Sequence, residues 1–103
     1  MDAPQITAYG DELYDALLAR TPVAPLTERE PGITIDDAYR IQLRMIERRV
    51  AAGERIIGKK IGVTSKVVQD MLKVDQPDFG QLLSGMVFNE GEAVSVARLI
   101  QPK

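Results

Sequence analysis

The stretch RIIGKKIGVT, residues 55–64, decides how the second half of this chain is interpreted. Hydrophobic residues recur in it with a period of two, which is typical of a β-strand. Adjacent residues of a strand point to opposite faces, so Lys59 and Lys60 are predicted to diverge. On the face of Lys60, the neighbours two positions away are Gly58 and Gly62, which have no side chains. We therefore expect a strand with one lysine on a bare face.

A lysine in this setting can do chemistry. Open space on both sides suits the close approach of a ligand to the ammonium. Such a lysine can hold a carboxylate or keto oxygen, stabilise an enolate or relay a proton. Alternatively, both glycines serve a bulge or tight packing and Lys60 reaches solvent. Spacing alone leaves both interpretations open. Thr64 shares the predicted face of Lys60 and could present a hydroxyl to the same ligand.

Two helices are predicted before this strand. The clearer one begins at an N-cap, Thr34, with Asp37 three residues later, and stops at Gly53. Its arginines are either a binding surface or, more commonly, a solvated face. An earlier helix is predicted over residues 6–20, followed by a loop over residues 22–31 that contains three prolines.

A short helix is predicted after the strand, over residues 66–72, with Ser65 as its cap. Pro77 then forces a loop that carries Asp78 and Phe79. A loop carboxylate beside an aromatic ring can act as an acid or base, although this sequence is also ordinary turn chemistry.

The last part of the chain is predicted to contain a turn and a second strand. The turn is expected at residues 89–91, where Asn and Gly favour it. The strand is expected around Val94 and Val96, which alternate with small or polar neighbours. The fold class predicted from these patterns is therefore α+β, with a helical region over residues 1–54 and a β-containing region over residues 55–103.

Composition excludes several classes of function. The chain has 103 residues, no cysteine and no histidine, so thiolate nucleophiles, a histidine base and cysteine-based zinc sites are excluded. The net charge of -2 argues against a nucleic-acid surface. No apolar run approaches the roughly 20 residues that cross a bilayer, so we expect no membrane association and a cytoplasmic location.

Three motifs in order resemble a known family. GKKIGVTS (residues 58–65) resembles the G-x-K-I-G-x-T-S signature of the 2-hydroxypenta-2,4-dienoate hydratases and their decarboxylase relatives, which are related to fumarylacetoacetate hydrolase. VQDML (68–72) followed by PDFG (77–80) looks like the hydratase branch, and LIQPK (99–103) resembles the next landmark of the family. The segment DDAYRIQ (36–42) is also similar to its N-terminal helix.

The resemblance implies an activity and a site. Members add water to 2-hydroxypenta-2,4-dienoate in aromatic meta-cleavage catabolism, by ketonisation and conjugate addition, with Mg²⁺ or Mn²⁺ bound. Lys60 matches the active-site lysine and Asp78 a loop carboxylate, while Thr64 and Phe79 are expected to bind substrate. No metal ligand is expected within the chain.

The resemblance also implies a longer protein, in which residues 55–103 are the start of a β-rich catalytic domain with a fumarylacetoacetate-hydrolase-like mixed β fold. The metal-binding glutamates of the family are expected beyond Lys103, so the chain is interpreted as the N-terminal portion of a hydratase. Homo-oligomers and association with the pathway decarboxylase are further expectations. Two alternatives remain: a 2-oxo-3-hexenedioate (4-oxalocrotonate) decarboxylase of the same family, and a non-catalytic fragment that docks through its amphipathic helices.

Overall fold

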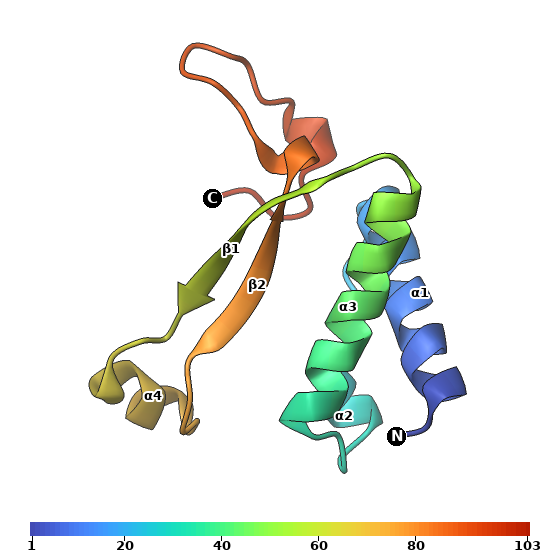
Figure 1. The fold of residues 1–103 in the computed structure, drawn as a ribbon, viewed down its shortest axis with the longest axis vertical. Helices are drawn as coiled ribbons and strands as arrows, with labels where there is room; N and C mark the ends of the chain where they lie inside the picture. Colours follow the sequence, from blue (N-terminus) through green and yellow to red (C-terminus); the bar gives the residue numbers. More distant parts are fainter. The chain divides into compact units, whose positions relative to one another are not determined.

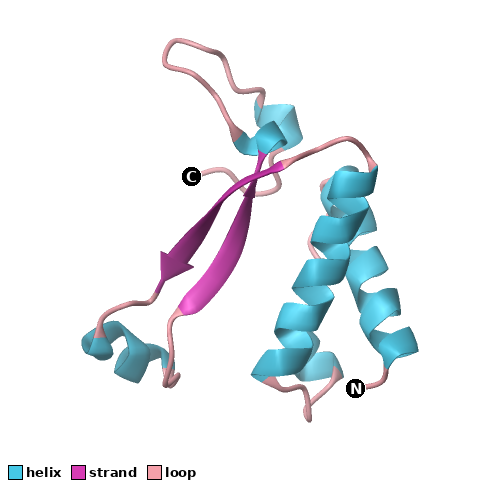
Figure 2. Ribbon diagram, in the orientation of Figure 1, coloured by secondary structure: helices cyan, strands magenta, loops and turns pink.

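The computed structural model describes residues 1–103, which form two compact units. One unit comprises residues 1–53 and 88–103, and the other comprises residues 54–87. Figures 1 and 2 show the elements. In chain order they are α1 (Ala3–Ala19), α2 (Leu26–Arg29), α3 (Ile35–Ala51), β1 (Ile56–Gly62), α4 (Lys66–Leu72), β2 (Asp78–Leu83) and two 3-10 turns, Ser84–Met86 and Val96–Arg98.

The first unit is built on the packing of α1 against α3. Ile6 of α1 and Ile41 and Ile46 of α3 are its buried apolar residues. Gly10 permits the close approach, because a Cβ there would lie only 2.5 Å from Cβ of Arg44 and 3.1 Å from the carbonyl oxygen of Ile41. The predicted helix over 6–20 is thus found, beginning three residues earlier than expected.

Both long helices begin with a capping box, which satisfies amide groups that have no partner within the helix. The Asp2 carboxylate accepts from the Gln5 amide at 2.9 Å, and the Gln5 side chain accepts in return from the Asp2 amide. At α3, the Thr34 hydroxyl accepts from the Asp37 amide and the Asp37 carboxylate accepts from the Thr34 amide, each at 3.1 Å. The cap predicted at Thr34 is confirmed.

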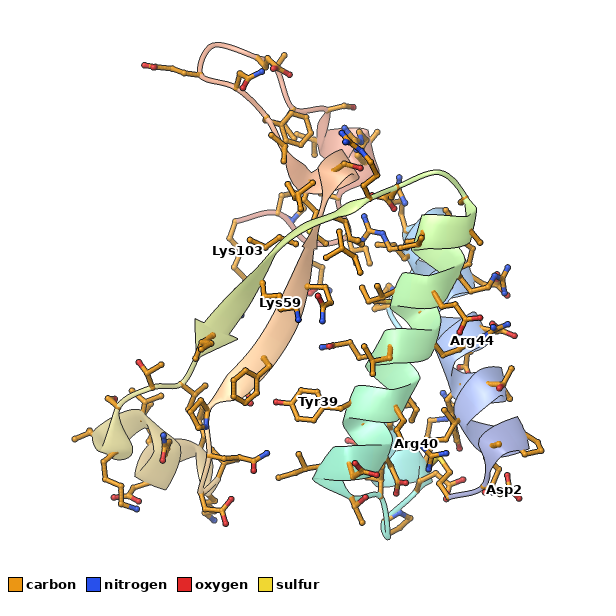
Figure 3. The ribbon with its side chains drawn as sticks, viewed as in Figure 1. Asp2, Tyr39, Arg40, Arg44, Lys59 and Lys103 are labelled. Carbon is orange, nitrogen blue, oxygen red and sulfur yellow. The ribbon has the colours of Figure 1, made fainter.

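The arginines of α3 are engaged within this unit. Arg44 and Arg48 both donate to the Asp11 carboxylate of α1 at 2.9 Å, and Arg44 extends from α3 on the side of α1 (Figure 3). Arg48 also lies over the Tyr14 ring, 4.5 Å from its centroid. These contacts between the helices hold the pKa of Asp11 below its usual range, because the Arg44 and then the Arg48 guanidinium groups donate to its ionised form.

The second unit is a β-hairpin with α4 inserted in its connection (Figure 2). β1 and β2 pair antiparallel. Ser65 caps α4 as predicted: its Oγ accepts from the Val68 amide at 3.2 Å. The strand β1 is shorter than the predicted 55–64, since it ends at Gly62 and Val63 turns into the left-handed region with φ 54°.

Three predictions about local structure are wrong. The loop over 22–31 contains the single-turn helix α2. The loop after Pro77 is instead the strand β2; a proline just before a strand removes no ladder hydrogen bond, so it does not prevent pairing. Residues 96–98 form a 3-10 turn in place of a strand, closed by the bond from the Arg98 amide to the Ser95 carbonyl.

Two other features agree with the sequence, the turn at residues 89–91 and the α+β class. The turn at residues 89–91 is present, with the Glu92 amide bonded to the Asn89 carbonyl at 3.0 Å and Gly91 at φ 85°. Helices together with an antiparallel sheet confirm the α+β class at that level. No helix combines the length and the apolar character needed to span a membrane.

Candidate active site on the β-hairpin

The register of the hairpin determines which side chains share a face. Residues directly opposite each other in an antiparallel pair point to the same side of the sheet. Lys60 lies opposite Gly80, and the two flanking pairs on that side are Gly58 with Leu82 and Gly62 with Asp78. We call this set the glycine face: Gly58, Lys60, Gly62, Asp78, Gly80 and Leu82.

The Lys60 side chain lies along the glycine face. A Cβ built on Gly80 would be 3.2 Å from Cγ of Lys60 and 3.5 Å from its Cδ, and a Cβ on Gly62 would be 3.5 Å from Nζ. The stem therefore crosses the position that a side chain at residue 80 would take, and the ammonium lies over Gly62. The Lys60 side chain itself occupies the room that Gly62 and Gly80 leave. The open-face interpretation, in which a ligand approaches the ammonium between Gly58 and Gly62, stays a prediction.

Gly58 has a different role. A β-bulge lies between Ile56 and Gly58, and a Cβ on Gly58 would meet the Leu82 side chain at 3.6 Å, an ordinary contact. The alternative in which a glycine serves a β-bulge therefore applies to Gly58, at the start of β1. The space beside Lys60 comes from Gly62 and Gly80.

Asp78 is on the same face as Lys60. It lies opposite Gly62, one pair along the hairpin from the Lys60–Gly80 pair. Diagonal neighbours of this kind have backbone positions about 7–8 Å apart, within reach of long side chains. Both residues are exposed and no ion pair joins them. A cation and a carboxylate thus border one exposed patch and remain available to a ligand.

Thr64 and Phe79 are placed differently. The alternation that put Thr64 on the face of Lys60 does not extend to it, because β1 ends at Gly62 and Val63 is left-handed. Phe79 lies opposite Ile61, so it points to the other face of the hairpin, away from the glycine face. The hairpin brings Lys60 and Asp78 together and leaves the substrate-binding roles of Thr64 and Phe79 as predictions.

The described residues do not fit a metal site by themselves. No group of three or more carboxylate, histidine or cysteine side chains is close enough to hold an ion. Divalent cations such as Mg²⁺ require several oxygen ligands, and Asp78 is the carboxylate of the glycine face. We therefore assign no metal ligand within these residues.

Sequence reasoning missed Gly80 because it missed β2. Residues 78–83 read DFGQLL, in which polar and apolar residues do not alternate with a period of two, because Phe79 and Gln81 share one face. Pro77 and the turn-like composition of the first three residues favour a loop instead. Without β2, no cross-strand partner of Lys60 could be named.

No family model matches the chain. Comparison with curated proteins identifies relatives of it. It is 60% identical over its full length to a 2-hydroxypent-2,4-dienoate hydratase of Pseudomonas putida, of which it covers 47%. A 2-hydroxyhexa-2,4-dienoate hydratase of Comamonas testosteroni is 54% identical over 99% of the chain, which covers 39% of that protein. The chain thus spans less than half the length of these relatives.

Solved structures give a second relative. The 4-oxalocrotonate decarboxylase of Pseudomonas putida G7, complexed with magnesium and adipate, matches with a TM-score of 0.77 and 28% identity over 82% of this chain and 32% of its own. A second structure of it, with calcium and acetate, matches with a TM-score of 0.78. Sequence and structure together confirm the resemblance that the motifs predict: the chain is similar throughout to 2-hydroxydienoate hydratases, and over most of its length to 4-oxalocrotonate decarboxylase.

Proposed function

We propose that this chain supplies the lysine-bearing part of the active site of a 2-hydroxypenta-2,4-dienoate hydratase, a hydro-lyase that forms 4-hydroxy-2-oxopentanoate. The observation that carries the proposal is the placement of Lys60, laid across Gly80 with its ammonium over Gly62 and Asp78 on the same face. The 60% identity to a hydratase over the full chain supports the reaction type.

Ketonisation and hydration of the dienol both require a fixed positive charge and a nearby group that transfers protons. The dienol loses its enol proton while a proton is added at C5, giving the 2-oxo-3-enoate; water then adds, with hydroxide bonding to C4 and a proton to C3. The Lys60 ammonium can hold the carboxylate or the 2-oxygen and stabilise the enolate that precedes each carbon protonation. Asp78, on the same face, can accept or deliver the protons.

The metal, the fold family and the assembly are parts of the same proposal. Use of Mg²⁺ is supported by the decarboxylase complexed with magnesium, and the expectation that its ligands lie beyond Lys103 stays a prediction. So do Mn²⁺ as an alternative, a fumarylacetoacetate-hydrolase-like β fold, a meta-cleavage pathway, homo-oligomers, association with the decarboxylase and a cytoplasmic location.

The competing function is decarboxylation of 2-oxo-3-hexenedioate (4-oxalocrotonate). It is favoured by the structural match, whose TM-score is 0.77. The hydratase is preferred because its sequence identity is 60% against 28%. A non-catalytic docking module has no comparable support, since Arg44 and Arg48 of α3 are engaged with α1.

The test uses the intact natural polypeptide that carries this chain. With Mg²⁺ present, we expect loss of the dienol absorbance of 2-hydroxypenta-2,4-dienoate and no carbon dioxide release from 4-oxalocrotonate. Lys60→Ala should lower kcat by about 100-fold or more, the scale of losing a transition-state donor. Lys59→Ala, a change of the same size one residue away, should leave kcat within about threefold because Lys59 faces the other way. Carbon dioxide release would favour the decarboxylase, and equal rates for both variants would remove Lys60 from the mechanism.

A further inference from the structure

Val63 adopts a backbone conformation that its side chain disfavours. Its φ of 54° lies in the left-handed region, which is uncommon for any residue with a Cβ and an outlier for a β-branched one. It follows directly after Gly62, at the point where β1 ends. Conformations of this kind persist only where the surrounding structure holds them.

A side-chain hydrogen bond holds this residue. The Nε2 amide of Gln69 donates to the Val63 carbonyl oxygen at 3.0 Å. Gln69 is itself fixed in α4, where its backbone amide bonds to the Ser65 carbonyl at 3.0 Å. The side chain of Gln69 in α4 therefore holds the carbonyl group of Val63, the left-handed residue six positions before it.

The strained turn adjoins the position of the Lys60 ammonium. Nζ of Lys60 lies 3.5 Å from the Cβ position of Gly62, and Gly62 shares a peptide bond with Val63. If Val63 relaxed to a β conformation, the Gly62–Val63 peptide would turn relative to the Val63 carbonyl that Gln69 holds, so either α4 or the end of β1 beneath the ammonium would have to shift. The conformation of Val63 and the position of Lys60 are thus mechanically connected.

We propose that Gln69 is a positioning residue for Lys60, acting through the left-handed conformation of Val63. The inference rests on the proposed hydratase function and adds a residue to it. Gln69 touches no reacting atom. Its contribution is to keep the end of β1 in the one backbone state that leaves the ammonium over Gly62.

The central test removes the donor while keeping the size of the side chain. In the intact natural polypeptide, Gln69→Met should lower kcat by about tenfold, the upper range for one hydrogen bond. Adding Val63→Gly should restore kcat to within about threefold of wild type, because glycine adopts the left-handed region at little steric cost. Asp70→Asn is the matched control: it removes only the exposed Lys66–Asp70 pair of the same helix and should leave kcat unchanged.

A second measurement does not depend on activity. With lysines labelled at ¹³Cε, the Lys60 resonance is assigned by its loss in Lys60→Ala. It should shift in Gln69→Met, return in the double variant and stay unchanged in Asp70→Asn. A wild type without hydratase activity would refute the proposed function, and the Lys60 resonance would still test the positioning.

Four results would overturn the positioning role. The first is wild-type kcat in Gln69→Met, and the second is an equal loss of kcat in Asp70→Asn, which would mean that α4 acts only through general stability. The third is a loss of kcat in Gln69→Met that Val63→Gly does not restore, and the fourth is a Lys60 resonance that does not shift in Gln69→Met.

Discussion

Gly80→Ala tests whether Lys60 requires a bare position on the neighbouring strand. The new Cβ would lie 3.2 Å from Cγ of Lys60 and 3.5 Å from its Cδ. Two carbons are at their optimal separation at about 3.5–4.0 Å, so the stem must move by roughly 0.3 Å or more at Cγ. Further bonds separate Cγ from Nζ, so the ammonium is displaced further or takes another rotamer. A misplacement of about 1 Å can cost 100-fold in rate, and we expect about tenfold here.

Gly80→Ala should change the free energy of unfolding much less than it changes kcat, and in the favourable direction if at all. Glycine within a strand is destabilising by roughly 0.5–1 kcal/mol relative to alanine, so Gly80→Ala gains this amount and loses part of it to the close contact. The free energy of unfolding should change by less than about 1 kcal/mol. A slower enzyme with unchanged or slightly higher stability is therefore the expected combination, and general damage to the fold would not produce it.

The assay follows loss of the dienol absorbance for kcat and urea unfolding for stability, in parallel. Gly58→Ala is the matched control, because its Cβ would meet only Leu82 at the ordinary distance of 3.6 Å. Its kcat should stay within about twofold of wild type, since ordinary van der Waals contact displaces nothing. Wild-type kcat in Gly80→Ala, or an equal loss in both variants, would refute the argument that Gly80 makes room for Lys60.

The other predictions concern one further position on the glycine face and two in the helical unit. Gly62→Val would fill the space at the Lys60 ammonium and should raise KM for the dienoate; an unchanged KM would count against an open ligand face. Gly10→Ala should destabilise the protein by about 1–3 kcal/mol in urea, because the new Cβ collides with Arg44, whereas Gly32→Ala, with no atom within 4 Å, should stay within about 0.5 kcal/mol. The pKa of Asp37 is lowered, first because the Thr34 backbone N–H donates to its carboxylate. Its contribution to stability is therefore present above the unfolded pKa of about 3.9 and lost as pH falls through the lower folded pKa, so the stability difference between wild type and Asp37→Asn should shrink below about pH 4.

The helices could be predicted because their signals are local. The reciprocal bonds of Thr34 and Asp37 join residues three apart, as does the bond from the Val68 amide to Ser65. A cap of this kind depends only on a few consecutive residues, so the sequence pattern is sufficient to predict it. The start of α1 escaped notice because Pro4 lies in its first turn, where proline is tolerated, and Asp2 rather than a later residue caps it.

The strand β2 could not be predicted because its partner lies some twenty residues away. Ile61 pairs with Phe79, and the helix α4 lies between them in the sequence. A short-range periodicity cannot indicate a pairing between residues so far apart in the chain. Lone strand patterns next to proline and glycine read as turns. The same limit explains the opposite error at residues 94–96, where alternation is present and no partner strand pairs with it.

The placement of two predicted site residues, Thr64 and Phe79, depended on information that a sequence pattern does not contain. The face of Thr64 was extrapolated from alternation, which fails where Val63 leaves the β region. The face of Phe79 depends on the register with Ile61, and a shift of one residue would reverse it. Lys60 and Asp78 were chosen for their chemistry and motif positions, and the register places both on one face.

The contrast between Lys59 and Lys60 shows what the hairpin adds to the chemistry of lysine. The two residues are adjacent, carry the same group and are both exposed, so neither charge nor burial separates them. Lys59 lies opposite Gln81, whose side chain occupies that face, and extends from β1 in Figure 3. Lys60 lies opposite Gly80 and beside Gly62, and its stem uses the room that both glycines leave. A long flexible side chain loses rotamer entropy when a ligand holds it in one conformation. This loss is smaller when the surrounding surface already restricts the side chain to that conformation. The missing side chains of two glycines on different strands therefore favour Lys60 over Lys59 as the lysine of the proposed active site.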